Sequence, residues 1–211
     1  TLTIRAGAFE RPDSDSDAGR GPLFSVDSSL ARAIDDRWAY RVSAGYFTQD
    51  PLSRPTGAIA NAFQTVYPSY TNVGTSQPKF EGRVDYDMTG GGAVTVSGGV
   101  AGTGGIIHSG IGPFNISNNS RLTHFTARYQ KDGRRIAIFT NLLSGSAATL
   151  LARGATGQPL PLVFDTKTFD MEASDVRVVG TRHVLTYGGN IRRNTFDISL
   201  APTGNDRNEG G

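Results

Sequence analysis

The chain has 211 residues, a length that fits one large domain or two small ones. A formal net charge of only +2 argues against a nucleic-acid-binding protein, which would gather its basic residues into a patch. The chain has no cysteine, which excludes a disulfide framework, a thiolate metal site and a cysteine nucleophile. Because the sequence has no run of ~18 apolar residues and no signal peptide, it predicts neither a membrane-spanning helix nor a targeting segment.

Apolar and polar residues alternate with a period of two along most of the chain, and this pattern is typical of β-strands. The alternation is clearest over residues 79–88 and 38–46. Helical periodicity is scarce, and no helix is predicted. The sequence predicts nine strands of about 10 residues, within 2–8, 22–33, 38–46, 79–88, 93–101, 121–130, 135–143, 168–174 and 185–192.

The connections between these strands alternate between short and long. The short ones predict tight turns, three of them through Gly or Asp-Gly; they are 35–37 (Asp-Asp-Arg), 90–92, 131–134 and 180–182. The long ones are polar; they are 10–21, 50–78, 102–120 and 144–163. Soluble sandwiches have no reason to sort connections in this way, whereas an up-and-down transmembrane barrel has short turns at one rim and long loops at the other.

Alternation alone fits a half-buried soluble sheet equally well, since that sheet also has one apolar face. The sorted connections favour the barrel, as do aromatic residues near the strand ends, which suit the interfacial girdles of an outer-membrane barrel. These aromatics are Phe9, Trp38, Tyr46, Phe47, Tyr86 and Phe196. The predicted fold class is therefore all-β, an antiparallel up-and-down transmembrane β-barrel fragment with about nine strands of a larger barrel.

The alternation also predicts which side chains share a face. Since lipid offers no hydrogen bonds, only an uncharged face can meet it. We expect one set to face lipid: Trp38, Tyr40, Val42, Phe80, Val84 and Tyr86. We expect the opposite set to face the lumen: Arg41, Lys79, Arg83 and Asp85.

Residues 180–192 (GTRHVLTYGGNIR) resemble a turn-plus-strand segment of TonB-dependent receptors, in which a G-x-x-H turn precedes an aromatic–Gly–Gly strand with a closing basic residue. Residues 194–202 (NTFDISLAP) are similar to the start of an extracellular loop in that family. Residues 38–46 (WAYRVSAGY) resemble an early barrel strand.

This resemblance implies a plugged barrel of about 22 strands, in the outer membrane of a Gram-negative bacterium. It implies active uptake of a scarce nutrient complex of the siderophore, cobalamin or oligosaccharide type. On this interpretation residues 1–211 are a partial barrel domain, beginning after the plug and lacking the plug domain and the C-terminal strands. The implied partners are outer-membrane lipid, the plug and remaining strands, the TonB complex and an extracellular nutrient ligand, with no nucleic acid.

Motifs for chemistry are scarce. His108, His124 and His183 share no metal-ligand spacing, so no metal is expected. The alternating carboxylates of residues 13–17 lack the glycine and distal glutamate of an EF-hand loop and are interpreted as a solvated loop. No G-x-S-x-G elbow and no phosphate-binding glycine motif occurs. The sequence therefore predicts neither an enzyme nor a cofactor.

The short turns are expected to face the periplasm and the long loops the outside of the cell. Ligand contact is expected in these extracellular loops, because recognition concentrates in loops carried by a rigid scaffold; they are 10–21, 50–78, 102–120, 144–163 and 197–211. The longest loop, 50–78, contains Phe63, Tyr67 and Tyr70, whose rings could stack on a chelate or a sugar, although loop-to-loop packing is equally compatible with them. Two other functions stay open. One is a soluble all-β carbohydrate-binding or adhesion module, and the other is a passive outer-membrane porin.

Overall fold

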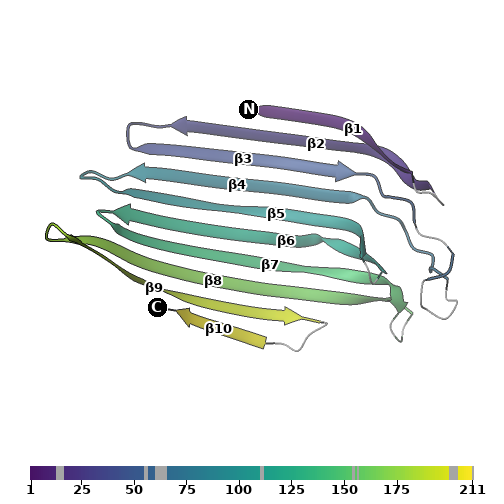
Figure 1. Cartoon of the computed structure of the whole chain (residues 1–211). Helices are drawn as coiled ribbons and strands as arrows, with labels where there is room; N and C mark the ends of the chain where they lie inside the picture. Colours follow the sequence, from purple (N-terminus) through teal and green to yellow (C-terminus); the bar gives the residue numbers. More distant parts are fainter. Residues whose placement is uncertain are drawn as a thin grey trace.

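The computed structural model describes residues 1–12, 17–54, 57–59, 66–109, 112–153, 155, 157–199 and 204–210. These residues form one antiparallel sheet in which ten strands follow each other in sequence order (Figure 1). The strands are β1 (Leu2–Pro12), β2 (Asp17–Ala33), β3 (Trp38–Gln49), β4 (Thr75–Asp87), β5 (Ala93–Ser109), β6 (Gly112–Lys131), β7 (Arg134–Arg153), β8 (Pro159–Val179), β9 (His183–Ile198) and β10 (Gly204–Gly210). Among the described residues, β1 and β10 do not pair, so the sheet is open. The predicted fold class, an all-β up-and-down sheet compatible with a barrel fragment, is confirmed.

The four short connections all lie at one end of the sheet, at the left in Figure 1. Three of them use backbone conformations with positive φ, which glycine adopts without strain, whereas no residue of the turn at 34–37 has a positive φ. The turn between β6 and β7 consists of Asp132 (φ 49°) and Gly133 (φ 83°), and all three glycines of the turn at 90–92 have positive φ. The tight turns predicted from the glycine and Asp-Gly positions are thus confirmed.

The opposite end of the sheet differs from the prediction. Segments 102–120 and 144–163 were expected to be loops, but β5–β6 and β7–β8 continue as paired strands almost to their tips. Much of 10–21 likewise belongs to β1 and β2. These segments lack an apolar face, so their sequence shows no alternation, yet the backbone ladder still satisfies their N–H and C=O groups. Among the connections at this end, only 50–74 is long.

The nine predicted strands are all present as β1 to β9. Residues 204–210, within the predicted loop 197–211, pair with β9 as a tenth strand. The strands are longer than the expected 10 residues as well, since β5 to β8 span 17, 20, 20 and 21 residues.

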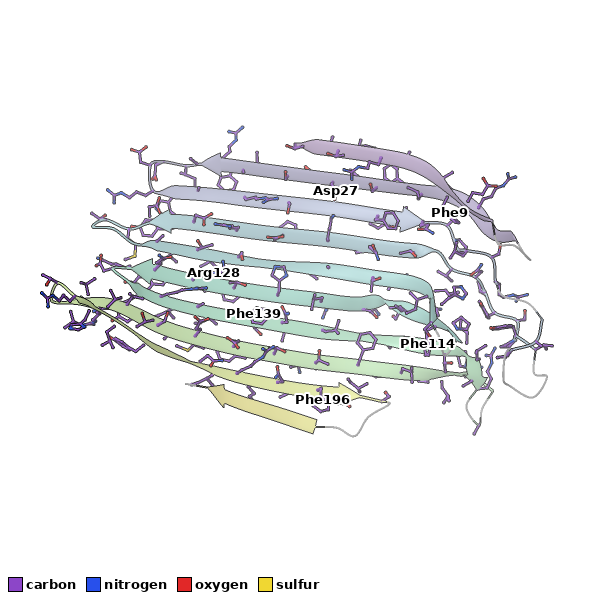
Figure 2. The ribbon with its side chains drawn as sticks, viewed as in Figure 1. Phe9, Asp27, Phe114, Arg128, Phe139 and Phe196 are labelled. Atoms are coloured by element: carbon purple, nitrogen blue, oxygen red, sulfur yellow. The ribbon has the colours of Figure 1, made fainter. Side chains whose placement is uncertain are left out.

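The strand register divides the side chains between two faces, because directly paired residues point to the same side. One row of paired residues joins Trp38, Tyr86, Val94, Tyr129, Ile136 and Ala173. We call the face with this row the apolar face. The neighbouring row joins Ala39, Asp85, Thr95, Arg128, Ala137 and Glu172 on the opposite, polar face. Asp27 and Arg128, labelled in Figure 2, belong to the polar face.

The sheet has almost no hydrophobic core of its own. In the described part of the chain, the only buried apolar side chains are Pro113, Phe114 and Leu150. A soluble domain of this size would bury most of its large apolar side chains between two layers. Across the ranges that the structure describes, no helix has the length and apolar character needed to cross a membrane.

Candidate functional site

The apolar face is an extended surface of exposed hydrophobic side chains. Its large residues are each more than a third exposed and come from nine consecutive strands, β1 to β9. They are Leu2, Ile4, Phe24, Leu30, Trp38, Val42, Tyr46, Phe80, Val84, Val96, Val100, Phe125, Ile136, Leu142, Phe169, Met171, Leu185, Tyr187 and Ile191. Soluble monomers rarely expose contiguous apolar patches larger than a few hundred Å². A face of this extent needs an apolar partner.

Aromatic residues with a polar group gather on this face near the short turns. They are Trp38, Tyr40, Tyr86, Tyr129 and Tyr187. The rings of Trp38 and Tyr86 pack against each other, with centroids 4.3 Å apart and an interplanar angle of 31°. Tyr and Trp favour positions where one end of the side chain is in an apolar medium and the other end in water.

The sequence-based division into faces is confirmed. Trp38, Tyr40 and Val42 on β3 pair with residues of the same apolar set on β4, which contains Phe80, Val84 and Tyr86. Arg41, Lys79, Arg83 and Asp85 lie together on the polar face. That these two faces meet lipid and a lumen respectively stays a prediction.

An ion-pair network crosses four strands of the polar face. Asp27 on β2 accepts from Lys79 on β4 at 2.7 Å, and Arg5 on β1 lies 3.6 Å from the same carboxylate. Between them on β3 is Gly45, which pairs with both Asp27 and Lys79. A Cβ at this position would contact Lys79 Cε and Asp27 Oδ1, so the glycine leaves the space through which the lysine reaches across β3.

A second network occupies the polar face nearer the short turns. Arg83 donates to both carboxylate oxygens of Asp85, through Nε and Nη2, at 2.7 to 3.0 Å, and Thr95 donates its hydroxyl to Asp85 at 2.7 Å. These side chains are substantially exposed, so they form a neutralised, water-facing charge ladder. A hollow of about 410 Å³ lies next to the first network, and its lining includes Asp27, Lys79 and Glu81.

The polar face also has an apolar hollow, which sequence analysis missed. It has a volume of about 530 Å³, and its lining includes Phe47, Leu122, Leu143 and Phe164. These residues come from β3, β6, β7 and β8 and lie toward the long-hairpin end. The only sequence signal is a local break in alternation, where apolar residues stand next to each other as in Leu142–Leu143.

The connection 50–74 contains the predicted ligand-contacting aromatics. Phe63 lies outside the described residues. Tyr70 is half-buried under the guanidinium of Arg54, which lies 5.6 Å from the ring centroid, and burial raises the pKa of its hydroxyl. Tyr67 is half-buried as well, and its N–H donates to Gly57 at 3.0 Å. The structure thus brings Tyr67 and Tyr70 into the same folded connection, and their contact with a ligand stays a prediction.

This connection is attached to the rest of the sheet. Asn72 donates its amide to the carbonyl of Leu52 at 2.6 Å, and Ile106 on β5 donates its N–H to Val73 at 3.3 Å. The described part of the connection therefore has a defined position beside the long hairpins.

One carboxylate near the short turns was not singled out from the sequence. Asp175 on β8 is 7% exposed and accepts from Arg177 Nε at 2.8 Å and from the hydroxyl of Tyr187 at 2.7 Å. Arg134 on β7 lies 3.8 Å away. These four residues lie on the apolar face near the short turns, where the carboxylate offsets one of the two guanidinium charges.

The remaining candidates stay apart from one another. His108, His124 and His183 lie on β5, β6 and β9, and within the described ranges no group of three or more His, Asp or Glu residues could hold a metal ion. The acidic segment 13–17 lies outside the described residues except for Asp17 at the start of β2.

No protein-family model matches the sequence, and no curated protein matches it.

Proposed function

We propose that this chain is part of an outer-membrane β-barrel of the TonB-dependent receptor type, which takes up a scarce nutrient complex from outside the cell. The observation that carries the proposal is the wide, exposed apolar face of a sheet whose strands follow each other in strict sequence order. Hydrocarbon is the partner that suits this face, since a spanning sheet must satisfy all backbone groups internally and present uncharged side chains outward.

The near absence of buried apolar residues favours a membrane barrel over a soluble carbohydrate-binding or adhesion module. A soluble module gains its stability from burial between layers, and here the described residues form a single layer. In a bilayer the same apolar side chains are transferred from water into lipid, which provides the missing apolar environment.

The polar face suits an aqueous lumen, because its charges are paired into exposed networks such as Asp27–Lys79 and Arg83–Asp85. The choice of an active receptor over a passive porin is supported by the likeness of residues 180–202 to TonB-dependent receptors. On this proposal the chain contacts outer-membrane lipid, a plug domain, further strands and the TonB complex, and its ligand is a siderophore, cobalamin or oligosaccharide complex.

Uptake measurements in cells test this proposal. The full-length protein is produced in the outer membrane of cells with and without TonB, and accumulation of a radiolabelled ferric siderophore, cobalamin and an oligosaccharide is measured. Uptake of one of these that requires TonB and stops with a protonophore supports the proposal. Uptake that is unchanged without TonB identifies a porin, and a detergent-free, monomeric, soluble protein identifies the soluble module.

The loop candidates are tested in the same assay. Tyr67→Ala and Tyr70→Ala are expected to weaken ligand binding to whole cells if these rings stack on the ligand, and Phe63→Ala provides the third arm. Val66→Ala is the matched control, because Val66 is an exposed apolar residue of the same connection without a ring. Unchanged binding in all three aromatic variants would assign the aromatics to packing within the connection.

A further inference from the structure

The charges on the apolar face lie along two oblique borders. The border toward the long hairpins is marked by Arg20 on β2, Arg121 on β6, Lys167 on β8 and Arg193 on β9. Directly paired residues connect Arg193 back to β2 through the row Phe169, Thr140, Phe125, Gly98, Gly82, Val42 and Leu30. Since Leu30 is ten residues from Arg20, the border shifts by ten residues over the seven steps from β2 to β9.

The border toward the short turns is oblique in the same sense. Arg32 on β2 is connected to β8 through the row Tyr40, Val84, Val96, Ala127, Ile138 and Met171. The first charged residues beyond this row are Lys131 on β6, four residues past Ala127, and the Asp175–Arg177 pair on β8, four and six residues past Met171. This border therefore shifts by about one residue per strand.

Between the two borders, the apolar face has no charged side chain on β2 to β9. We call this region the uncharged band. It crosses the strands obliquely, shifting by one to about 1.4 residues at each step. With a rise of ~3.3 Å per residue and ~4.8 Å between strands, this shift corresponds to an angle of about 35 to 45° between the strands and the normal of the band.

The height of the uncharged band is consistent with this angle. On β6 the borders at Arg121 and Lys131 are ten residues apart. Ten residues of strand measure ~33 Å, and at a tilt of ~40° they project to about 25 Å, the height of the apolar band of outer-membrane barrels. The angle comes from charge positions and register alone, yet it agrees with the ~35–45° tilt that transmembrane barrels adopt.

We infer that the uncharged band is the hydrocarbon-facing belt of the protein, and that the strands cross the bilayer at this tilt with the short-turn border in one headgroup layer. The inference rests on the proposed function and adds the level of each strand in the membrane. A group of aromatic residues with polar ends lies next to the short-turn border: Trp38, Tyr40, Tyr86, Tyr129 and Tyr187. Tyr and Trp side chains favour a membrane–water interface, so this position fits a headgroup layer.

The tilt makes residues of one paired row differ in depth. Tyr40 and Ile138 belong to the same row, but Tyr40 is near the short-turn border of β3, whereas Ile138 is close to the middle of the band on β7. Val26 is six residues from Arg32, the member of that row on β2, and it lies in the middle of the band there. Val26 and Ile138 should therefore share one depth, and Tyr40 should be shallower.

Spin labelling of the full-length protein in phosphatidylcholine vesicles tests this arrangement. Single cysteines are introduced as Val26→Cys, Tyr40→Cys and Ile138→Cys, with Arg41→Cys on the polar face as the matched control, and accessibility to oxygen and to a water-soluble nickel complex is measured. We expect labels at 26 and 138 to show the same ratio of oxygen to nickel accessibility, a several-fold lower ratio at 40, and water exposure at 41. Phe24→Cys, Tyr86→Cys and Met171→Cys replace any variant that fails to assemble.

The outcomes separate the tilt from the proposed function. Equal depths at 40 and 138, with 26 displaced from them by ~20 Å along the strand direction, would overturn the tilt while leaving the membrane barrel in place. Water exposure at 26, 40 and 138 would overturn the membrane placement itself and with it the proposed function.

Discussion

The substitution Ala44→Arg is expected to destabilise the protein strongly in a bilayer. Ala44 is on the apolar face of β3, near the middle of the uncharged side chains that this face presents between Trp38 and Thr48, and it pairs with Ser28 and Phe80. Replacing alanine leaves no cavity, so the change measures the transfer of a charge. An arginine on the lipid face near the midplane costs roughly 2–4 kcal/mol, which lowers the folding equilibrium constant by about 30- to 900-fold.

Ser43→Arg is the matched control, because Ser43 is the adjacent residue on the polar face and pairs with Glu81. The new guanidinium would lie in water beside a carboxylate, so its effect should stay within about 0.5 kcal/mol. The free energy of unfolding is measured for the full-length protein in phosphatidylcholine vesicles by urea titration. Equal costs for the two variants, or a larger cost for Ser43→Arg, would refute the assignment of the two faces.

Three further changes test individual features of the sheet. Gly45→Val should lower the urea midpoint of unfolding, because the valine side chain would displace Lys79 from Asp27. Gly82→Val should leave the midpoint unchanged, because position 82 has open space on the apolar face. Equal midpoints for the two variants would contradict the inference that Gly45 leaves room for the Lys79–Asp27 ion pair. Gly133→Ala should cost about 1 kcal/mol or more, since φ is 83° and a Cβ would contact the Val176 carbonyl, and refolding measurements at wild-type stability would refute this. Proteinase K, which cuts with broad specificity, should cleave within 50–74 when added to intact cells and spare the turn at 131–134, and the reverse pattern would invert the predicted sidedness.

The two faces could be predicted from sequence because alternation encodes them wherever one face is apolar. In 38–46 and 79–88 every second residue is apolar, and the structure pairs these segments with the apolar sets aligned. The long hairpins could not be predicted, since segments such as 102–109 and 112–120 are rich in Gly, Ser and Asn on both faces. Their strands are stabilised by backbone pairing, which leaves no pattern in side-chain polarity.

The side-chain networks depend on register, which local sequence does not contain. Asp27, Gly45 and Lys79 are far apart in the chain and meet only because β2, β3 and β4 pair in one alignment. The same holds for Asp175, whose partners Tyr187 and Arg134 come from the two adjacent strands. Of the candidate ligand contacts, the sequence located the long connection correctly, while the packing of Tyr70 against Arg54 required the folded loop.

The two ends of the sheet should differ in their tolerance of insertions and deletions. A single residue added to the Asp132–Gly133 turn would have to be absorbed by a two-residue hairpin, and if β7 slipped by one position to absorb it, Ile136 and Ile138 would exchange faces with Arg135 and Ala137. A residue added to the connection 50–74 leaves the pairing of β3 with β4 unchanged, because the extra length stays outside the ladder. Length variation among related chains should therefore accumulate at the long-hairpin end, while the four tight turns keep a fixed length.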